Sequence, residues 1–567
     1  MSVSQTILDI AEICVQQKVT HLILSPGSRN APLALAFFRH PQMITRIVPD
    51  ERVAGYIAIG IAQSINQPVL LLSTSGTAVL NYGPAIAEAY YQQVPLIVLT
   101  ADRPPEWIGQ NDGQAIKQDR VFANHTKQSF QLPVDMDHED AKWHTLRVIN
   151  EAINVAHDHA SGPVHINVPF REPFYPSVDQ PWIYQKQVPV VTKQIVENAI
   201  GEDQWSLLLQ EWQQATKILV VGGQNRPSIE LRAALEAIQQ HAKVPIVGDA
   251  ISNLHSVTKL IKHPEHILGQ SQKMLEQLQP DLLITLGGGV ISKNLKLFLR
   301  KYPAKVHWHL QQGGYPADCF KSISRVIPLH PERFFNQLCK LIPTQTNSDW
   351  YDMWQTFEQK SLEGFNEFIN DQEFNELQVI GKVLSSSEQI HLHLANSSVV
   401  RWADLFGISP ETIEVTANRG TSGIDGCSSV AVGHSLSNQR QNLLITGDMA
   451  FFYDRNAFWH PYSIANLKIV VINNHGGGIF RLVDGAKDQP ELEELFVTSQ
   501  RLSAKNTAQD FGMSYFYCDA MADLSYNLEQ LFSTDDRIGL LEIVVRNNMA
   551  EIYKELKANI KNLYEAD

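Results

Sequence analysis

Residues 442–478 read NLLITGDMAFFYDRNAFWHPYSIANLKIVVINNHGGG and contain two apolar runs that each end in polar residues. The first run ends in Gly447 and Asp448, and the second ends in Asn473 and Asn474. The interval between Asp448 and Asn473 is 24 residues, which is about the length that a crossover helix and a second parallel strand occupy. The spacing therefore predicts that both polar pairs emerge at the same edge of a parallel sheet.

Oxygen-bearing groups gather at the ends of these two runs. The Asp448 carboxylate, the Asn474 amide and a backbone carbonyl near Gly476 suit Mg²⁺, which prefers octahedral oxygen donors completed by phosphate oxygens. The glycines from Gly476 to Gly478 allow backbone amides to approach such phosphates closely. The alternative is that both pairs are ordinary turn residues at strand ends. Their paired spacing favours a diphosphate site with Mg²⁺ or Mn²⁺.

The same alternation of apolar runs and helical patterns occurs in three successive stretches of the chain. The apolar runs lie at 21–25, 68–74, 95–101 and 163–169, then at 217–223, 244–250, 281–289 and 305–310, and finally at 391–398, 414–420, 442–448, 467–474 and 539–545. Such alternation is typical of parallel sheets covered by helices on both faces. We therefore predict an α/β fold of three consecutive doubly wound parallel-sheet domains, with ligands at the carboxyl ends of the strands.

Two stretches without helical periodicity separate these series. Residues 171–191 are rich in proline and aromatic residues, and residues 342–350 interrupt the second series. A chain of 567 residues exceeds the size at which one hydrophobic core keeps growing. We predict domains at 1–180, 195–342 and 365–567.

The composition is that of an acidic globular protein. Apolar residues make up 44%, charged residues 19%, and the formal net charge is −14. An acidic surface repels phosphates at long range, so neither a nucleic acid nor an anionic membrane is an expected partner. Five cysteines without a CxxC pair indicate neither disulfides nor a zinc site, and fit a reducing cytoplasm. The N-terminal stretch is an acidic amphipathic helix pattern and no apolar run approaches about eighteen residues, so we expect neither secretion nor a membrane span.

The Gly-Asp and Asn-Asn pairs at this spacing resemble the fingerprint of the thiamine-diphosphate enzyme superfamily. Met449 stands where that fingerprint has a second glycine, a mild departure because glycine is not a side-chain ligand. The resemblance implies that Gly447, Asp448, Met449 and Asn474 bind thiamine diphosphate, with Asp448, Asn474 and Gly476 as metal ligands. It also makes the third domain the diphosphate- and metal-binding domain.

The resemblance implies a catalytic glutamate in the first domain. The superfamily uses a glutamate that hydrogen-bonds N1′ of the aminopyrimidine ring and drives the ring into the imino form, which acts as a base. Glu51 fits this catalytic role and would contact the cofactor. It follows the run at 44–50 and is the first residue of a helical segment with small residues along one face. Its other interpretation is a helix-start acid favoured by the helix dipole.

The segment STSGTAVLNYGPAIAEA at 73–89 also resembles the superfamily's pyrimidine-binding domain. The resemblance implies that the first domain has this role and that Ser75, Gly76 and Thr77 lie near the cofactor. Serine and threonine turns after strands are otherwise common. In this superfamily different subunits bind the two ends of the cofactor, so the implied minimal unit is a homodimer, which also allows a dimer of dimers.

Several loops narrow the resemblance. They are SPGSRNAPL (25–33), DERVAGYIAIGIA (50–62), TADRPPEWIG (100–109), QAIKQ (114–118), NRGTSGIDG (418–426) and NNHGGGIF (473–480). Together they resemble the 2-succinyl-5-enolpyruvyl-6-hydroxy-3-cyclohexene-1-carboxylate synthase family of menaquinone biosynthesis, over nearly the whole chain and most weakly in the middle domain. This resemblance implies a transferase that decarboxylates 2-oxoglutarate and adds the remaining succinyl unit to isochorismate in a 1,4 sense.

Each of the two implied substrates carries two carboxylates, so a productive site needs several cations. Matched to the family motifs, the residues implied to bind substrate are Arg29, Arg103, Gln114, Lys293, Ser397, Arg401, Arg419, Ile479 and Phe480. Ile424 is implied to support the bent cofactor, which Ile479 also contacts. Taken alone, each basic residue has the alternative of a solvated surface side chain, and Ile424 has that of a core residue.

Two other functions remain open from the residues. One is another thiamine-diphosphate enzyme, either a 2-oxo acid decarboxylase or an acetolactate-synthase-like carboligase, which would need fewer cations. The other is a nucleotide-binding or scaffold protein built on inactive α/β domains. LGGGV at 286–290 is the one phosphate-loop feature for that alternative, and it lacks the GxGxxG spacing. The presence of Glu51 with Asp448 and Asn474 argues against an inactive scaffold.

Overall fold

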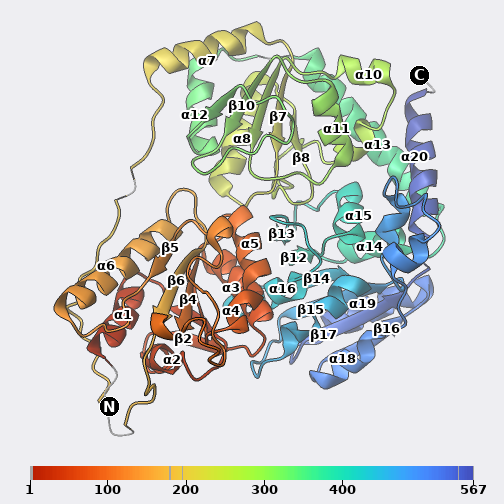
Figure 1. Ribbon diagram of the computed structural model, residues 1–567. Coiled ribbons are helices and arrows are strands. Elements are labelled where there is room, and N and C mark those ends of the chain that lie inside the picture. Colours follow the sequence, from red (N-terminus) through yellow and green to blue (C-terminus); the bar gives the residue numbers. More distant parts are fainter. Residues whose placement is uncertain (1–3, 178–180, 195, 346, 547, 566–567) are drawn as a thin grey trace. The chain divides into compact units, whose positions relative to one another are not determined.

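The computed structural model describes residues 4–177, 181–194, 196–345, 347–546 and 548–565 (Figure 1). These residues form three sheets of six, five and six strands, and every strand pair is parallel. Helices connect the strands and cover both faces of each sheet. The predicted α/β fold with three doubly wound parallel sheets is confirmed.

The first sheet has the strand order β2-β1-β3-β4-β6-β5. Its strands are β1 (His21–Leu24), β2 (Ile44–Ile47), β3 (Val69–Ser73), β4 (Leu96–Asp102), β5 (Ser129–Gln131) and β6 (Val164–Pro169). Its helices are α1 (Gln5–Gln16), α2 (Ala31–Phe38), α3 (Glu51–Ile65), α4 (Thr77–Asn81), α5 (Gly83–Tyr91) and α6 (Glu139–Ala156). Helices α1, α2 and α6 pack on one face, and α3 lies on the other with α5 against it. Strands β3, β4 and β6 are buried throughout, as expected of strands covered on both faces.

The second sheet has the strand order β11-β10-β9-β7-β8. Its strands are β7 (Ile218–Gly222), β8 (Ile246–Gly248), β9 (Leu282–Leu286), β10 (Val306–Leu310) and β11 (Arg325–Ile327). The helices that follow the chain through it are α7 (Glu202–Gln214), α8 (Ile229–Ala242), α9 (Pro264–Ile267), α10 (Gln272–Gln277), α11 (Lys293–Lys301) and α12 (Pro331–Leu341). One hydrophobic core lies under α7, α8 and α12, and a second lies under α9 and α11.

The third sheet has the strand order β13-β12-β14-β15-β17-β16. Its strands are β12 (His391–Leu394), β13 (Glu414–Thr416), β14 (Asn442–Gly447), β15 (Leu467–Asn473), β16 (Ser514–Cys518) and β17 (Gly539–Val544). The accompanying helices are α13 (Asp349–Asn370), α14 (Glu376–Ser385), α15 (Ser398–Phe406), α16 (Cys427–Ser437), α17 (Asp448–Tyr453), α18 (Ala504–Asp510), α19 (Met521–Phe532) and α20 (Met549–Glu565). Apolar side chains of α14, α15, α19 and α20 form one core with the sheet.

The first and third sheets share one topology. Numbered within each sheet, the strands of both run in the order 2-1-3-4-6-5. Open α/β sheets bind ligands at the carboxyl ends of the strands beside the point where the strand order reverses. Those points lie between β1 and β3 and between β12 and β14. The loops that follow these four strands carry Arg29, Ser75, Ser397 and Asp448.

By its contacts the chain divides into two compact units, which are described separately. One consists of Met1–Val196, Asn418–Gln439 and Tyr453–Ile464, and the other of Glu197–Ala417, Arg440–Phe452 and Ala465–Asp567. The first unit contains Glu51, and the second contains Asp448 and Asn474. The domain limits at 1–180, 195–342 and 365–567 stay predictions.

Helices α3 and α16 of the first unit approach so closely that only glycine fits at their crossing. A Cβ on Gly60 would lie 2.2 Å from the Val430 carbonyl oxygen, and a Cβ on Gly433 would lie 2.3 Å from the Ile57 carbonyl oxygen. Most of α3 is buried. Glu51, at its N-terminus, therefore stands on a rigid element, as precise placement of a functional group requires.

Asp454 follows α17 and bonds to the first turn of α16. Its Oδ2 accepts a hydrogen bond from the Ser429 amide (2.7 Å), and its Oδ1 accepts one from the Ser429 hydroxyl (2.8 Å). Burial raises the pKa of Asp454 to about 7, against the opposing effect of the Ser429 bonds. The Asp454 carboxyl group thus binds its proton more tightly in the folded state than in the unfolded state. Stability contributed by the protonated group is complete below the unfolded pKa of 3.8 and is lost as the pH rises to about 7.

Asp454→Asn is expected to remove this pH dependence, because the amide can accept from one Ser429 donor and donate to the hydroxyl without ionising. The variant should exceed the wild type in stability at pH 8 by an amount on the order of 3 kcal/mol, and match it near pH 4. Thermal unfolding midpoints of both proteins between pH 4 and pH 8 measure the gap. A gap that stays constant over this range would contradict the assignment.

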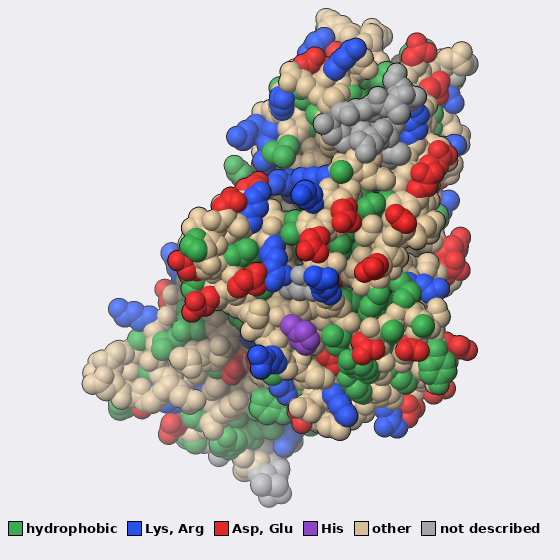
Figure 2. Space-filling model, turned by 90° about the vertical axis from the view of Figure 1, so that its right-hand side faces the viewer, with side chains coloured by type: hydrophobic (Ala, Val, Ile, Leu, Met, Phe, Trp, Pro, Cys, Tyr) green, Lys and Arg blue, Asp and Glu red, His purple; other side chains and the backbone are tan. Residues whose placement is uncertain are grey.

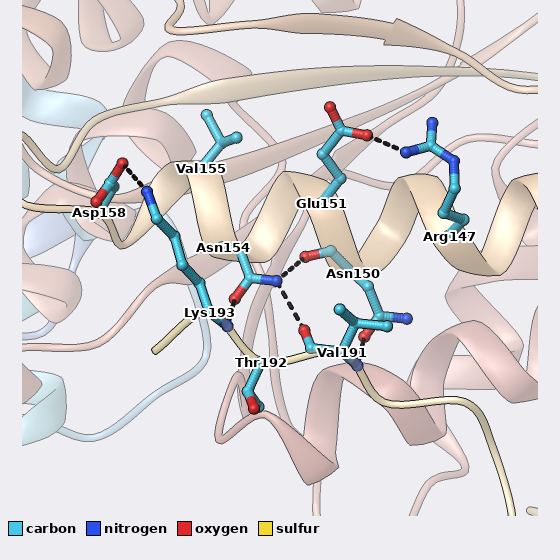
Figure 3. Close-up of a pocket in the computed structure, with 9 residues that line it drawn as sticks. All are labelled: Arg147, Asn150, Glu151, Asn154, Val155, Asp158, Val191, Thr192 and Lys193. Carbon is cyan, nitrogen blue, oxygen red and sulfur yellow. Dashed lines mark hydrogen bonds and ion pairs between the residues drawn. The ribbon is translucent and has the colours of Figure 1, made fainter. Parts of the chain in front are cut away.

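Two asparagines on α6 fasten the described end of the predicted linker to the first unit (Figure 3). Asn150 donates to the Pro189 carbonyl (2.8 Å). It also accepts from the amide of Val191 (2.7 Å), a residue that Figure 3 draws beside it. Asn154, one helical turn later, donates to the Val191 carbonyl (2.7 Å) and accepts from the Lys193 amide (3.0 Å). The described part of the linker has no helix or strand, as predicted. The pocket between the linker and α6, about 430 Å³, contains none of the predicted site residues.

Acidic and basic side chains are interspersed on the face of the molecule that Figure 2 shows. Among the described residues, no helix combines the length and the apolar character that crossing a membrane requires.

Candidate active site

In the second unit, Asp448 opens α17 directly at the end of β14. Its side chain is 2% exposed, and its Oδ2 accepts a hydrogen bond of 2.6 Å from Gln500 Nε2. Burial raises the pKa of Asp448, while the bonds from Gln500 and from nearby backbone amides lower it. A carboxylate that is poorly solvated in this way is stabilised by an adjacent cation.

The two asparagines at the end of β15, Asn473 within the strand and Asn474 directly after it, have different surroundings. Strand register places β14 and β15 side by side, with Gly447 opposite Ile472, so both polar pairs emerge together as predicted. Asn473 Nδ2 donates to the buried Glu542 (2.7 Å), and its Oδ1 accepts from Gln500 (3.2 Å). Asn473 is thus engaged in internal bonds, whereas the Asn474 Oδ1 accepts one long bond, from the Gly476 amide (3.2 Å).

Glu376 is a buried carboxyl that the sequence did not single out. It is the first residue of α14, and its Oε2 accepts a hydrogen bond from Asn474 Nδ2 (3.3 Å). Its Oε1 accepts a hydrogen bond from the Ser398 hydroxyl (2.5 Å). Burial raises the pKa of Glu376, the charge of Asp448 adds to the rise, and the hydrogen bonds oppose it. In the sequence this residue looks like any acid in the first turn of a helix, so no local signal identifies it.

The glycine turn after β15 is closely packed, whereas the end of the neighbouring strand β14 is open. A Cβ on Gly476, whose φ is 155°, would lie 2.9 Å from the Val497 carbonyl oxygen, so glycine is required there. The Gly476 carbonyl accepts from the Gly478 amide (3.0 Å) and keeps a second lone pair. At Gly447, the last residue of the neighbouring strand β14, an added Cβ would meet no atom within 4 Å, so the space beside that residue is open.

The oxygen donors at this edge of the sheet suit an Mg²⁺ ion that takes part of its ligands from another molecule, and not a metal bound by the protein alone. One carboxylate and one amide oxygen are too few to complete an octahedron, and Mg²⁺ in such sites takes its other ligands from phosphate oxygens and water. In the parts of the chain that the structure describes, no group of three His, Cys, Asp or Glu side chains is arranged to hold a metal. The arrangement therefore suits a metal that binds together with a phosphate-bearing molecule.

Two predicted substrate residues lie at the start of α15, directly after β12. Ser397 has a φ of 79° and precedes the first residue of the helix. The Arg401 guanidinium, one turn later, donates to the Ser397 carbonyl. Arg401 is exposed as a residue, yet partial burial of its guanidinium lowers its pKa, against the opposing charge of Glu265.

Lys293 of the second sheet's helix α11 reaches the loop that follows the glycine turn. Its ammonium lies 3.8 Å from Asp484 Oδ2, and both side chains are exposed. Asp484 follows the short helix that contains Ile479 and Phe480. Ile479 packs against the core of the third sheet, and Phe480 is exposed with its ring 5.9 Å from that of Phe496. The structure thus places Lys293 beside the loop that follows Ile479 and Phe480, a segment far from it in sequence.

In the first unit, the loops after β1 and β3 are in close contact. A Cβ on Gly27 would lie 2.3 Å from the Thr74 Cβ. Gly76 has a φ of 90°, its amide donates to Gln118 Oε1 (2.8 Å), and a Cβ there would lie 3.2 Å from the Gln114 backbone. The structure therefore brings Gln114 to the turn that carries the predicted cofactor residues.

The Ser75 hydroxyl in this turn is buried and has no hydrogen-bond partner within the described residues. Buried hydroxyl groups in proteins are nearly always hydrogen-bonded. The orphaned hydroxyl therefore fits a polar ligand group at this turn, as the cofactor assignment requires. Thr77, the first residue of α4, is exposed.

Glu51 is the first residue of α3, which is capped by Asp50. The Asp50 Oδ1 accepts a hydrogen bond from the Val53 amide (3.3 Å). The half-buried Glu51 accepts at its Oε2 a hydrogen bond of 3.4 Å from Asn81 Nδ2. Burial raises the pKa of Tyr82, and the negative charge of Glu51 adds to the rise. Asp50 thus meets the capping need of the helix, which leaves the Glu51 carboxylate available for another role.

Two of the three predicted arginines of the first unit, Arg29 and Arg103, have different environments. Arg29 is 6% exposed, donates to the Phe170 carbonyl (2.9 Å) and lies 4.5 Å over the Phe174 ring. The interpretation as a solvated surface side chain is therefore wrong for Arg29. Arg103 forms an ion pair with Asp112 (2.8 Å).

The loop that carries Arg419 and Ile424 is fastened at both ends within the first unit. The buried Glu88 accepts hydrogen bonds from the two backbone amides that follow Arg419 (2.9 and 2.6 Å). Tyr56 of α3 donates to Asp425 (2.5 Å). Both Arg419 and Ile424 are half-buried. Neither Glu88 nor Tyr56 was identified from the sequence, since each lies in an ordinary helical pattern.

Two family descriptions match the chain. "Thiamine pyrophosphate enzyme, N-terminal TPP binding domain" matches residues 6–147, and "Middle domain of thiamine pyrophosphate" matches residues 176–394. With three doubly wound sheets and the oxygen-rich edge of the third, these matches define a thiamine-diphosphate enzyme.

Curated relatives identify the family more narrowly. A protein of Cytophaga hutchinsonii named 2-succinyl-5-enolpyruvyl-6-hydroxy-3-cyclohexene-1-carboxylate synthase is 42% identical, over 99% of this chain and 100% of its own length. Proteins of the same name from Flavobacterium johnsoniae and Bacteroides thetaiotaomicron are 37% and 35% identical, over 94% and 90% of this chain and 95% and 90% of their own lengths. The chain belongs to the family of 2-succinyl-5-enolpyruvyl-6-hydroxy-3-cyclohexene-1-carboxylate synthases.

Proposed function

We propose that the protein is a transferase that decarboxylates 2-oxoglutarate and adds the remaining succinyl unit to isochorismate in a 1,4 sense. The products are carbon dioxide and 2-succinyl-5-enolpyruvyl-6-hydroxy-3-cyclohexene-1-carboxylate, an intermediate of menaquinone biosynthesis. The observation that carries the proposal is the pair of oxygen donors, Asp448 and Asn474, at the shared edge of β14 and β15. The name that the relatives carry describes the product of this transfer.

In this proposal the second unit holds the metal and the diphosphate. Asp448, Asn474 and the Gly476 carbonyl are ligands of Mg²⁺ or Mn²⁺, and diphosphate oxygens complete the coordination. Gly447 and Met449 border the diphosphate. The open side of Gly447 and the poorly solvated Asp448 carboxylate support this assignment.

Glu51 is the proposed catalytic residue of the first unit. Its carboxylate holds a proton at N1′ of the aminopyrimidine ring. When bound, thiamine diphosphate supplies the nucleophilic carbon and the electron sink that decarboxylation needs. Ser75, Gly76 and Thr77 border the ring, and the orphaned Ser75 hydroxyl supports that contact. In this proposal Ile424 supports the bent cofactor, and Ile479 also contacts the cofactor. Exclusion of water matters for the reaction, since early protonation would release only an aldehyde.

Cations and polar side chains bind the carboxylates of the two substrates in this proposal. The residues assigned to this role are Arg29, Arg103, Gln114, Lys293, Ser397, Arg401 and Arg419, with Ile479 and Phe480 against the carbon skeletons. Guanidinium groups suit planar carboxylates because they can form two parallel hydrogen bonds. In an acidic protein, their position after strand ends or in first helical turns supports the assignment.

The same proposal extends to the domains, the assembly and the compartment. We assign pyrimidine binding to 1–180 and diphosphate binding to 365–567, with 195–342 contributing Lys293. The functional unit is a homodimer or a dimer of dimers, because the superfamily binds the two ends of the cofactor with different subunits. Five free cysteines support a reducing, cytoplasmic location.

The decisive experiment follows the consumption of 2-oxoglutarate with and without isochorismate, in the presence of thiamine diphosphate and Mg²⁺. We expect consumption to require both organic substrates and to release one carbon dioxide per adduct formed. Conversion of pyruvate to acetolactate, or release of succinic semialdehyde at full rate without isochorismate, would replace the proposal with one of the other thiamine-diphosphate activities. Removal of Mg²⁺ with a chelator should stop turnover, and Mg²⁺ or Mn²⁺ should restore it.

A further inference from the structure

Glu376 connects two parts of the candidate site that are assigned to different tasks. One of its carboxylate oxygens accepts a hydrogen bond from Asn474, a proposed metal ligand, and the other accepts one from Ser398, next to Ser397, a proposed substrate residue. Glu376 is 2% exposed. It comes from a third segment, the start of α14, which lies outside both loops.

The hydrogen bond to Glu376 determines which way the Asn474 amide faces. A carboxylate oxygen only accepts, so the NH₂ group of Asn474 must point toward Glu376. The amide oxygen then points away from Glu376, on the side of the Gly476 amide (3.2 Å). Without this acceptor only the long bond from the Gly476 amide would favour the observed orientation, and a rotated amide would present nitrogen donors where a metal needs oxygen.

The second oxygen of Glu376 holds the turn that begins α15. The Ser398 hydroxyl donates to it over 2.5 Å, and Ser398 itself is buried. The preceding residue, Ser397, has a φ of 79°, a conformation that residues other than glycine seldom adopt. The Arg401 guanidinium bonds the Ser397 carbonyl in the same turn. A buried carboxylate thus anchors the turn from which both side chains extend.

We propose that Glu376 is a positioning residue that orients the Asn474 amide oxygen toward the metal with one carboxylate oxygen and fixes the Ser397–Arg401 turn with the other. The proposal rests on the metal and substrate roles proposed above. Bonds of this kind behind metal ligands are worth about 10-fold to 100-fold in metal affinity.

Glu376→Gln tests the proposal because glutamine keeps the size of the side chain but has one oxygen to share between two donors. If that oxygen accepts from Ser398, its NH₂ group faces the NH₂ group of Asn474. If the NH₂ group instead donates to the Ser398 hydroxyl, Asn474 keeps an acceptor but loses the charged one, so the hold on its amide weakens in either arrangement. We expect the affinity for Mg²⁺ in the presence of thiamine diphosphate, measured by calorimetry, to fall about 10-fold to 100-fold. Unchanged affinity in a folded variant would overturn the proposal.

Reversing the hydrogen bond gives a rescue that a merely structural residue would not show. In the double variant Glu376→Gln with Asn474→Asp, the glutamine NH₂ can donate to the new carboxylate while its oxygen accepts from Ser398. We expect the double variant to bind Mg²⁺ with thiamine diphosphate at least about 10-fold more tightly than either single variant. In Asn474→Asp alone, two buried carboxylates would face each other. Additive losses in the double variant would refute the orienting role.

Two further variants separate the two functions of the carboxylate. Ser398→Ala removes only the donor to the other oxygen, so we expect a higher KM for the organic substrates with Mg²⁺ affinity kept within about threefold. Equal loss of Mg²⁺ affinity in Ser398→Ala and Glu376→Gln would count against the division of roles. Glu12→Gln alters another buried glutamate that accepts from an amide, Gln16 Nε2 (2.7 Å), in helix α1. It should leave Mg²⁺ affinity unchanged.

The binding measurements distinguish this inference from the proposed reaction. Mg²⁺ and thiamine diphosphate are titrated without any organic substrate, so an error in the substrate assignment leaves the Glu376 result interpretable. Wild-type protein that fails to bind the pair would contradict the metal role of Asn474 itself, and with it the orienting role of Glu376.

Discussion

Glu51→Gln should lower kcat by about 10²-fold to 10⁴-fold while the fold and the binding of thiamine diphosphate persist. Glutamine has the size of glutamate and can still hydrogen-bond a ring nitrogen. It cannot carry the negative charge that stabilises the protonated N1′, so the ring loses its basic form. Steady-state kinetics with 2-oxoglutarate and isochorismate measure the loss, and calorimetry with thiamine diphosphate and Mg²⁺ measures retained binding.

A matched substitution tests the alternative role of Glu51 as a helix-start acid. Glu139 is likewise the first residue of a helix, α6, and is exposed. If both glutamates serve only the helix dipole, Glu51→Gln and Glu139→Gln should each cost about 0.3–1 kcal/mol of stability and leave kcat unchanged. Full activity of Glu51→Gln would therefore refute its catalytic assignment.

Asp448→Asn should weaken the binding of Mg²⁺ with thiamine diphosphate by at least about 100-fold. The variant keeps the shape of the side chain, so Gln500 can still approach it, but the charged oxygen ligand is lost. At a fixed concentration of the pair, a 100-fold loss of affinity removes about 2.7 kcal/mol of ligand-induced stabilisation. The rise in thermal midpoint on adding Mg²⁺ and thiamine diphosphate measures this difference directly.

The control is the same substitution in Asp454, which is also a buried aspartate. Asp454→Asn changes the stability of the unliganded protein with pH but touches no proposed metal ligand. The midpoint rise on adding Mg²⁺ and thiamine diphosphate should therefore match that of the wild type. An Asp448→Asn variant that shows the full rise would exclude Asp448 as a ligand.

The parts of the fold that the sequence predicts are those with a strong local signal. The central strands β3 and β4 begin with continuous apolar runs, because both their faces are buried. Strand β6 is buried throughout as well, although His165 and Asn167 interrupt its apolar residues. The edge strands β5 and β16 were not predicted. Residues 129–131 are too short for a pattern, and the exposed side of 514–518 gives the strand a mixed composition. Pairing with a neighbouring strand, and not the local sequence, determines whether such a segment forms a strand.

The same distinction holds for the candidate site. Asp448 and Asn474 could be predicted because each directly follows an apolar strand, and the register of two neighbouring strands brings them together. Glu376, by contrast, acts through a contact between residues 376 and 474, and no spacing in the sequence encodes that contact. The burial of Arg29 depends in the same way on the segment that contains Phe170 and Phe174. Contacts between residues that are far apart in the sequence can be identified only from the folded structure.

The hydrogen bonds between the two asparagines of α6 and the linker backbone determine which substitutions and deletions the linker tolerates. Asn150 and Asn154 recognise peptide groups, not side chains, at alternate positions of an extended segment. Side-chain identity there is almost unconstrained, apart from proline at 191 and 193, which would remove an amide donor. The number of residues in the linker is constrained, since deleting one residue would shift every later peptide group by about 3.3 Å and turn it to the opposite side. We therefore expect the linker to tolerate many substitutions but not a change in its number of residues.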